Sequence, residues 1–293
     1  MPADAQTTHT TPASTILPAA TRLGPVELIV TDLDRAVAFY QDVIGLRPHR
    51  LEPPVAALGV GGEDLLILTE NPGARPAGRH AGLYHVAILF ESRLELARAA
   101  LRIASTRTPI QGASDHHTHE AIYLPDPDGN GLELAADRPR NQWPQRELYV
   151  SGPAPLDTHA LFALVEGEEP RRPAAEGVTI GHVHLHVADI GEALRFYRDA
   201  IGFELQAQMP TACFVSAGGY HHHVGFNVWR GERVPPVDPG AVGMGWFTVV
   251  VPDAGALEAV ATRLRAAGLG FARADDGTIS VSDPSGNALR VQR

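Results

Sequence analysis

The histidines of this chain are gathered into a few short segments. One segment is His85 with Tyr84 before it, and the others are residues 115–119, 182–186 and 220–223, which together hold most of the 14 histidines. A neutral imidazole can bind a divalent metal, and it can also take up or release a proton near neutral pH. The clustering therefore indicates metal binding, proton transfer or both.

Composition narrows the class of protein that carries these histidines. The 293 residues are 44% hydrophobic and 20% charged, which suits two compact domains in water. A net charge of −10 without a basic cluster argues against a nucleic-acid partner. The single cysteine, Cys213, excludes an internal disulfide and fits a reducing cytoplasm. Apolar runs such as residues 247–251 are too short to span a membrane.

The chain repeats itself. Residues 31–40 resemble residues 188–197, and the segment 126–130 resembles 283–287. The same step of 157 positions separates three matching pairs: Tyr40 and Tyr197, Gly45 and Gly202, Asp126 and Asp283. Self-similarity at a fixed step predicts a tandem duplication.

Each half divides again into two strand–helix–strands units, which predicts an α+β fold. In the first unit a β-branched strand at 26–30 is followed by a helix that starts near Asp32 and ends at Gly45. The pattern restarts at 83–90, where a helix over 94–103 follows, and again at 183–187 and 246–251. The sequence thus predicts four modules.

The repeat also predicts the domain boundaries. Residues 1–20 are rich in Thr, Ala and Pro and lack the features of a signal peptide, so we interpret them as a flexible tail. Residues 21–137 form the first domain and residues 178–293 the second. The proline-rich segment 138–177 between them is a linker, with one short helix near 159–165.

The motifs resemble a known superfamily. They are Ala-x-x-Phe-Tyr-x-x-x-x-Gly, the segments 82–89, 123–133, 180–187 and 217–223, and the module ending Asp-Pro-x-Gly-Asn-x-Leu-Glu. From Leu23 to Val291 the chain looks like the vicinal oxygen chelate superfamily of glyoxalases, bleomycin-binding proteins and extradiol dioxygenases, and is most similar to the four-module bacterial catechol 2,3-dioxygenase branch. The resemblance implies four βαβββ modules that form two open-barrel domains.

The resemblance also implies a metal site. In this superfamily a His on the first strand and a Glu on the last strand of a module are ligands, and the matching residues are His85, Glu133 and His182. The matching positions of modules one and four hold residues that cannot be ligands: Pro25, Trp246 and Arg290. Two histidines and one carboxylate form a facial triad, which suits Fe(II) and also accepts Mn(II).

These ligands come from modules two and three, whereas the usual extradiol arrangement takes them from modules three and four. The departure implies that modules two and three face each other in one barrel, and that modules one and four form a second pair without a metal. His184 and His186 share the strand face of His182, because side chains alternate along a strand. Either could replace it as a ligand.

The resemblance assigns roles to three more residues. His222 matches the second member of a paired-histidine motif and would be the catalytic base, unless residues 220–223 form a solvent-exposed loop. Tyr123 would donate a hydrogen bond to a substrate oxygen, unless it simply packs in the core. His116 would either contact the substrate or support a residue that does, and His117 and His119 compete with it for that role.

The segment 126–130 is interpreted as a structural turn with solvated carboxylates. The role of the residues that follow module two is left open. Arg138, Arg140 and Trp143 either close over the site or belong to a linker docked on the surface.

The implied function is ring cleavage of a catechol-like substrate, with both atoms of O2 entering the product. Alternatives are a hydroquinone-cleaving dioxygenase, a glyoxalase-like metalloenzyme with Glu27 as its extra carboxylate, and a non-catalytic binding protein. The sequence does not decide whether copies of the chain form a homo-oligomer.

Overall fold

The computed structural model describes residues 16–144 and 152–293. The predicted tail therefore lies mostly outside the described residues. The described ranges contain four βαβββ modules and a connecting segment, as the duplicated sequence predicts.

The modules follow one another along the chain. The first two consist of β1 (Arg22–Val30), α1 (Leu33–Phe39) with its continuation η1 (Tyr40–Ile44), β2 (Arg47–Glu52), β3 (Val55–Val60) and β4 (Glu63–Glu70), then β5 (Gly82–Phe90), α2 (Arg93–Thr106), β6 (Gly112–Asp115), β7 (His119–Pro125) and β8 (Gly131–Asp137). The connecting segment contains η2 (Arg140–Gln142), β9 (Ala154–Pro155) and α3 (Thr158–Ala163), which confirms the predicted short helix. The last two modules consist of β10 (Thr179–His186), α4 (Ile190–Leu194) with η4 (Arg195–Ile201), β11 (Glu204–Gln208), β12 (Ala212–Ser216) and β13 (Val224–Asn227), then β14 (Gly243–Val250), α5 (Ala254–Ala266), β15 (Ala272–Arg273), β16 (Ile279–Ser282) and β17 (Ala288–Gln292).

The module helices begin at side-chain caps and two of them end at glycine. The side chains of Asp32, Ser92, Asp189 and Asp253 each accept a hydrogen bond from a backbone N–H of the first helical turn. Gly45 and Gly202 end η1 and η4 with φ of 91° and 103°, a conformation that glycine adopts without steric cost.

The strands form two open sheets, and each sheet draws on both halves of the sequence. One has the order β11-β12-β13-β10-β5-β8-β7-β6-β9, and the other has the order β15-β16-β17-β14-β1-β4-β3-β2. Modules two and three therefore share a sheet, and modules one and four share the other, which confirms the predicted pairing. The domain boundaries 21–137, 138–177 and 178–293 follow the sequence repeat and stay a prediction.

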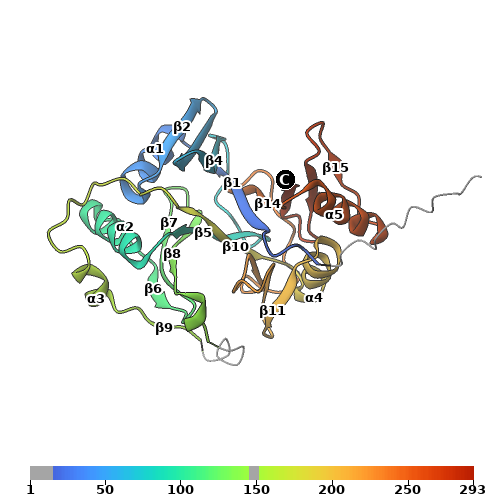
Figure 1. Cartoon of the computed structure of the whole chain (residues 1–293). Coiled ribbons are helices and arrows are strands. Elements are labelled where there is room, and N and C mark those ends of the chain that lie inside the picture. Colours follow the sequence, from blue (N-terminus) through green and yellow to red (C-terminus); the bar gives the residue numbers. More distant parts are fainter. Residues whose placement is uncertain (1–15, 145–151) are drawn as a thin grey trace, which may run out of the picture.

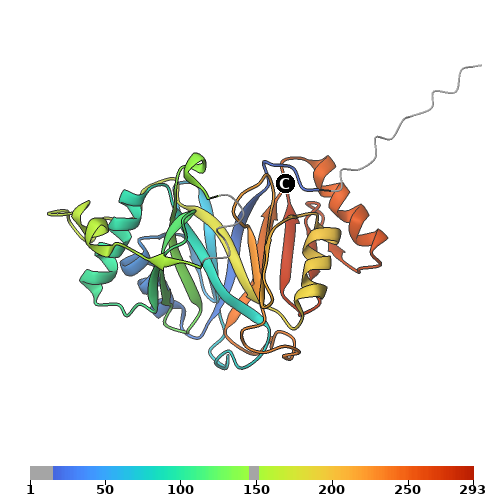
Figure 2. The same ribbon diagram turned by 90° about the horizontal axis from the view of Figure 1, so that it is seen from below.

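Buried strands occupy the centre of the molecule and the helices flank it. Figures 1 and 2 show α1 and α2 on one side of the strands and α4 and α5 on the other. The core residues include Val26, Leu28, Val86, Val183 and Phe247, each fully buried. None of the helices in the described ranges is long and apolar enough to cross a membrane.

The predicted turn at 126–130 is structural, but the expectation that its carboxylates are solvated is wrong for Asp128, whose side chain is 4% exposed, and for Asp126. The Asp126 side chain is buried and accepts hydrogen bonds from the backbone of Asp128 and Asn130 and from the Tyr40 hydroxyl, which lies 3.1 Å away. In the second half Asp283 is bound in the same way by Tyr197, at 3.0 Å. Each bond joins a module of one sheet to a module of the other.

Candidate metal centre and active site

Three neighbouring strands bring the predicted ligands together. In the parallel pair β5–β8, Ala87 lies opposite Glu133, and in the antiparallel pair β5–β10 it lies opposite His182. Directly opposed residues point to the same side of a sheet, and so do residues two apart on one strand. Glu133, His182 and His85 therefore meet on one face, over the small side chain of Ala87.

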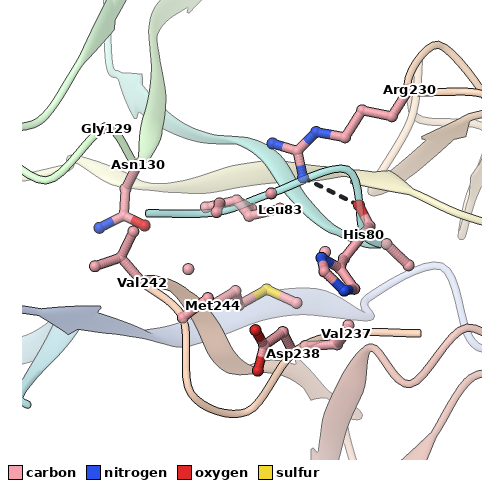
Figure 3. A pocket seen from close by; sticks show the side chains of 15 residues that line it. His80, Leu83, Gly129, Asn130, Arg230, Val237, Asp238, Val242 and Met244 are labelled. Atoms are coloured by element: carbon pink, nitrogen blue, oxygen red, sulfur yellow. Dashed lines mark hydrogen bonds between the residues drawn. The ribbon is translucent and has the colours of Figure 1, made fainter. Parts of the chain in front are cut away.

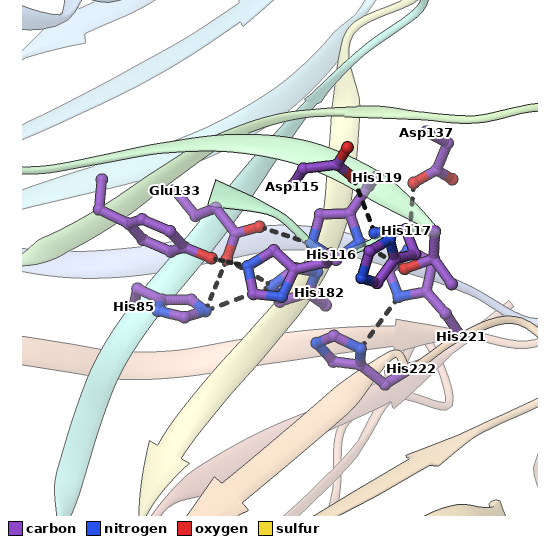
Figure 4. A network of polar contacts seen from close by, with 12 residues as sticks. His85, Asp115, His116, His117, His119, Glu133, Asp137, His182, His221 and His222 are labelled. Atoms are coloured by element: carbon purple, nitrogen blue, oxygen red, sulfur yellow. Dashed lines mark hydrogen bonds and ion pairs between the residues drawn. The ribbon is translucent and has the colours of Figure 1, made fainter. Parts of the chain in front are cut away.

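The three donor atoms lie close to one another. Nε2 of His85 is 3.0 Å from Oε2 of Glu133, Nε2 of His182 is 3.1 Å from the same oxygen, and the two nitrogens are 3.3 Å apart. Donors at right angles around a metal at about 2.1 Å are separated by roughly 3 Å. The spacing fits a facial triad, and Figure 4 shows the three side chains pointing toward one another.

The site holds a buried carboxylate beside buried imidazoles. Glu133 is only 1% exposed, and although burial acts to raise its pKa, His182 and His85 hold that pKa well below its usual range. Burial lowers the pKa of His182 despite the neighbouring Glu133. An ionised carboxylate and neutral imidazoles are the protonation states that a metal requires of such ligands.

His116, His119 and Tyr123 extend the site along β7. Nε2 of His119 lies 3.0 Å from Oε1 of Glu133, whereas His85 and His182 face the other carboxylate oxygen, Oε2. Nε2 of His116 lies 2.7 Å from the Tyr123 hydroxyl, and its ring stacks on His119. Both His116 and His119 line the cavity described below, whereas His117 does not. Tyr123 lines it as well, so it is not a packed core residue.

The segment 221–223 is a buried loop between β12 and β13 rather than a regular strand. The loop brings His221 to the site. Its ring stacks on His119, its Nδ1 lies 2.9 Å from Nδ1 of His222, and its Nε2 lies 3.1 Å from Oδ1 of Asp137. The ring of His222 lies 4.1 Å from that of His182, so His222 borders the triad.

The start of the connecting segment supports this loop. Arg140 donates to the carbonyl oxygen of Gly218, and the ring of Trp143 lies 5.3 Å from that of His221. Arg138 instead bonds the carboxylates of Asp115 and Glu120. The three residues are not among those that line the cavity, which favours packing against the loop over closure across the site.

A cavity of about 560 Å³ opens beside the triad. All three triad residues line it, together with His184, His222 and further residues, mostly apolar or aromatic. His186 does not line it, and its Nδ1 lies 2.8 Å from Oδ1 of Asn227.

A second hollow lies where residues 77–83 meet residues 237–244, and Arg230 donates to the His80 carbonyl oxygen beside it (Figure 3). Its volume of about 40 Å³ suits a few waters but not an organic substrate. The large cavity is therefore the candidate active site.

Comparison with known families agrees with this fold. The model of the Glyoxalase/Bleomycin resistance protein/Dioxygenase superfamily matches residues 22–134 and again residues 179–291. The chain belongs to this superfamily.

One relative within the superfamily is similar over almost its full length. It is a protein of Bacillus subtilis (strain 168) named catechol-2,3-dioxygenase, 40% identical over 276 residues, which are 92% of this chain and 95% of the relative.

Solved structures share the fold. A putative dioxygenase from Bacillus subtilis subsp. subtilis str. 168 superposes with a TM-score of 0.64 at 14% identity, covering 95% of this chain and 86% of that one. Glyoxalase I from Zea mays superposes with a TM-score of 0.58 at 20% identity, covering 93% and 92%. At these identities the likeness concerns the fold alone.

The structure adds residues to the site that the sequence analysis missed. Asp137 lies four positions after Glu133 on β8, so the alternation of side chains could have placed it on the same face. Trp229 and Phe214 also line the cavity, but no spacing or motif pointed to them.

Proposed function

We propose that the protein is an extradiol ring-cleaving dioxygenase for catechol-like aromatic substrates. The observation that carries the proposal is the convergence of Nε2 of His85, Nε2 of His182 and Oε2 of Glu133 within 3.3 Å of one another at the wall of the cavity. The 40% identity to a protein named catechol-2,3-dioxygenase supports it.

In this proposal His85, His182 and Glu133 would hold Fe(II), for which Mn(II) is an alternative with the same ligand preference. When bound, such a metal would supply Lewis-acid binding of the substrate oxygens and electron exchange with O2. His119 bonds the remaining carboxylate oxygen of Glu133 and so fixes its orientation.

The hydrogen bonds of the loop support His222 as the base. Asp137 is ionised, since its bond from His221 keeps its pKa low against the opposing effect of burial, and it can only accept. His221 must therefore carry its proton on Nε2, so its Nδ1 accepts from Nδ1 of His222. This leaves Nε2 of His222 without a proton and able to take one from a substrate hydroxyl.

Tyr123 and His116 complete the substrate contacts in the proposal. Burial raises the pKa of Tyr123, so its hydroxyl stays protonated and can donate to a substrate oxygen. His116, 2.7 Å away, orients that hydroxyl.

The overall reaction balances without an added reductant. A ring carbon–carbon bond next to a hydroxyl-bearing carbon breaks, and both atoms of O2 enter the product. The electrons that reduce O2 come from the substrate ring.

The glyoxalase-like alternative is less well supported. Glu133 is the only carboxylate among the described residues that line the cavity. Glu27, which that alternative would use as an extra carboxylate, belongs to β1 in the other sheet and accepts a hydrogen bond from Thr69.

The proposal is tested by loading the protein anaerobically with Fe(II) and measuring O2 uptake with catechol and with hydroquinone. We expect uptake with catechol and a yellow product that absorbs visible light. Uptake with hydroquinone alone would favour the alternative dioxygenase, and iron binding without uptake from either compound would contradict ring cleavage.

Variants test the ligand set. Glu133→Ala and His182→Ala should both lose iron and all uptake, even though the two residues lie in different halves of the sequence. His186→Ala is the matched control, because His186 is a buried histidine of the same strand outside the cavity. Full iron content in Glu133→Ala would show that the ligand set is wrong.

A further inference from the structure

Strand β10 carries three histidines on one face, and the proposed ligand set uses one of them. His182, His184 and His186 are spaced two residues apart, so their side chains point to the same side of the sheet. All three are buried. His184 and His186 are therefore buried imidazoles beside a metal site to which the proposed reaction gives no task.

His184 is the nearer of the two to the triad. In the antiparallel pair β5–β10 it lies directly opposite His85. The two rings are 5.1 Å apart, with an angle of 80° between their planes. His184 also lines the cavity beside the triad. A further imidazole from this place would fill one of the positions that a facial triad keeps open for substrate and O2.

One side chain, that of Asn227 at the end of β13, contacts both of these histidines. Its Nδ2 lies 3.0 Å from Nε2 of His184, and its Oδ1 lies 2.8 Å from Nδ1 of His186. The strand register accounts for these contacts, because Asn227 lies opposite His186 in the parallel pair β10–β13. Asn227 is fully buried, so its amide depends on these partners.

The backbone of Trp229 determines which way the Asn227 amide faces. Its N–H donates to Oδ1 of Asn227 at 3.0 Å, which identifies that atom as the amide oxygen. The amide nitrogen therefore faces His184 and donates to its Nε2, while Oδ1 accepts from Nδ1 of His186. The lone pair that Nε2 of His184 would need for binding a metal is thus engaged by the amide.

We propose that Asn227 is a positioning residue that holds His184 away from the metal and so keeps the triad at three ligands. The inference rests on the ligand set of the proposed function, but not on ring cleavage. A buried imidazole nitrogen without a hydrogen-bond partner is unfavourable. Without the amide, Nε2 of His184 therefore requires another partner, and a metal bound beside His85 can supply one.

Asn227→Leu tests the inference, because leucine is of similar size and has no amide. The metal-free protein is loaded with one equivalent of Cu(II), and pulsed EPR counts the imidazoles that bind it. We expect two in the parent protein, from His85 and His182, and three in Asn227→Leu. Two in both proteins would overturn the inference and leave the ligand set intact, whereas any other number in the parent would overturn both. The count does not depend on whether the protein cleaves rings.

A second substitution identifies the added imidazole. In the double variant Asn227→Leu/His184→Phe the count should return to two, because phenylalanine keeps a ring on β10 but has no nitrogen. A count that stays at three would overturn the role given to His184. Asn227→Ala removes the amide without adding any atoms, and it replaces Asn227→Leu with the same expected counts if the leucine variant does not fold.

The rate of iron release separates this role from a merely structural one. Transfer of Fe(II) from the protein to a chelator should be about tenfold slower in Asn227→Leu than in the parent, because a further ligand strengthens binding. A loosened site would release iron faster, and that result would contradict the inference. Asn287→Leu is the matched control, because Asn287 is a buried asparagine whose amide bonds Asp283 and the carbonyl oxygen of His186 instead of an imidazole. It should keep two imidazoles and show no slowing.

Discussion

At the scale of single residues, the proposed base depends on a side chain that does not line the cavity. His222 borders the triad, but the proton on its Nδ1 is fixed through His221 by Asp137. The Tyr220 hydroxyl donates to the other oxygen of the same carboxylate, at 2.9 Å. Asp137 is therefore a positioning residue whose charge determines which nitrogen of His222 is free.

Asp137→Asn is expected to reverse this arrangement. Tyr220 needs an acceptor, so the amide oxygen should face Tyr220 and the amide NH2 should face His221. The protons of His221 and His222 would then shift, and Nε2 of His222 would no longer accept one. We expect kcat to fall by about 100-fold while KM for catechol and iron content change little.

Asp64→Asn is the control for this variant, because Asp64 also pairs with a histidine, His49 at 2.9 Å, but on the other sheet. Its kcat should stay within about twofold of the parent. A parent-like kcat in Asp137→Asn would mean that the carboxylate does not govern His222.

At the scale of elements, the triad depends on a small residue between its members. Ala87 on β5 lies directly between Glu133 on β8 and His182 on β10, and it is fully buried. A larger side chain there would occupy the space in which the Glu133 and His182 side chains meet.

Ala87→Leu should therefore lose iron while the protein stays folded. Overpacking a buried position typically costs about 1–3 kcal/mol, less than the stability of most domains. Iron content and thermal unfolding are measured together. Ala56→Leu, at a fully buried alanine of β3 in the other sheet, should lose similar stability yet keep its iron.

The elements were largely predictable from the sequence, but their contacts were not. Strand and helix periodicity predicted the four modules. The positions of His85, His182 and Glu133 predicted the pairing of modules two and three, which the strand order confirms. Periodicity describes one strand at a time, so it could not reveal that Ala87 separates two ligands. Nor could it reveal that residues 221–223 form a buried loop that turns His221 toward His119.

At the scale of the whole molecule, the two duplicated halves share their fold but differ in the side chains at the positions that correspond to the triad. On the other sheet the positions matching His85 and Glu133 hold Trp246 and Arg290, and the Arg290 guanidinium lies 3.8 Å from the centre of the Trp246 ring. That sheet packs a cation on an aromatic ring, whereas the corresponding positions of its counterpart hold the proposed metal ligands. Both halves retain the tyrosine–aspartate bond.

These two bonds should contribute equally to stability without affecting the metal site. Tyr40→Phe leaves a buried oxygen of Asp126 without one donor, and Tyr197→Phe does the same to Asp283. Each change should lower the free energy of unfolding by about 1–2 kcal/mol, and the two should add in the double variant because the bonds lie in separate halves. Urea unfolding measures the stability, and iron content and O2 uptake should match the parent protein. If only one of the two variants is less stable in urea, only one half still depends on its tyrosine–aspartate hydrogen bond. The conserved bond would then not have the same structural role in both halves.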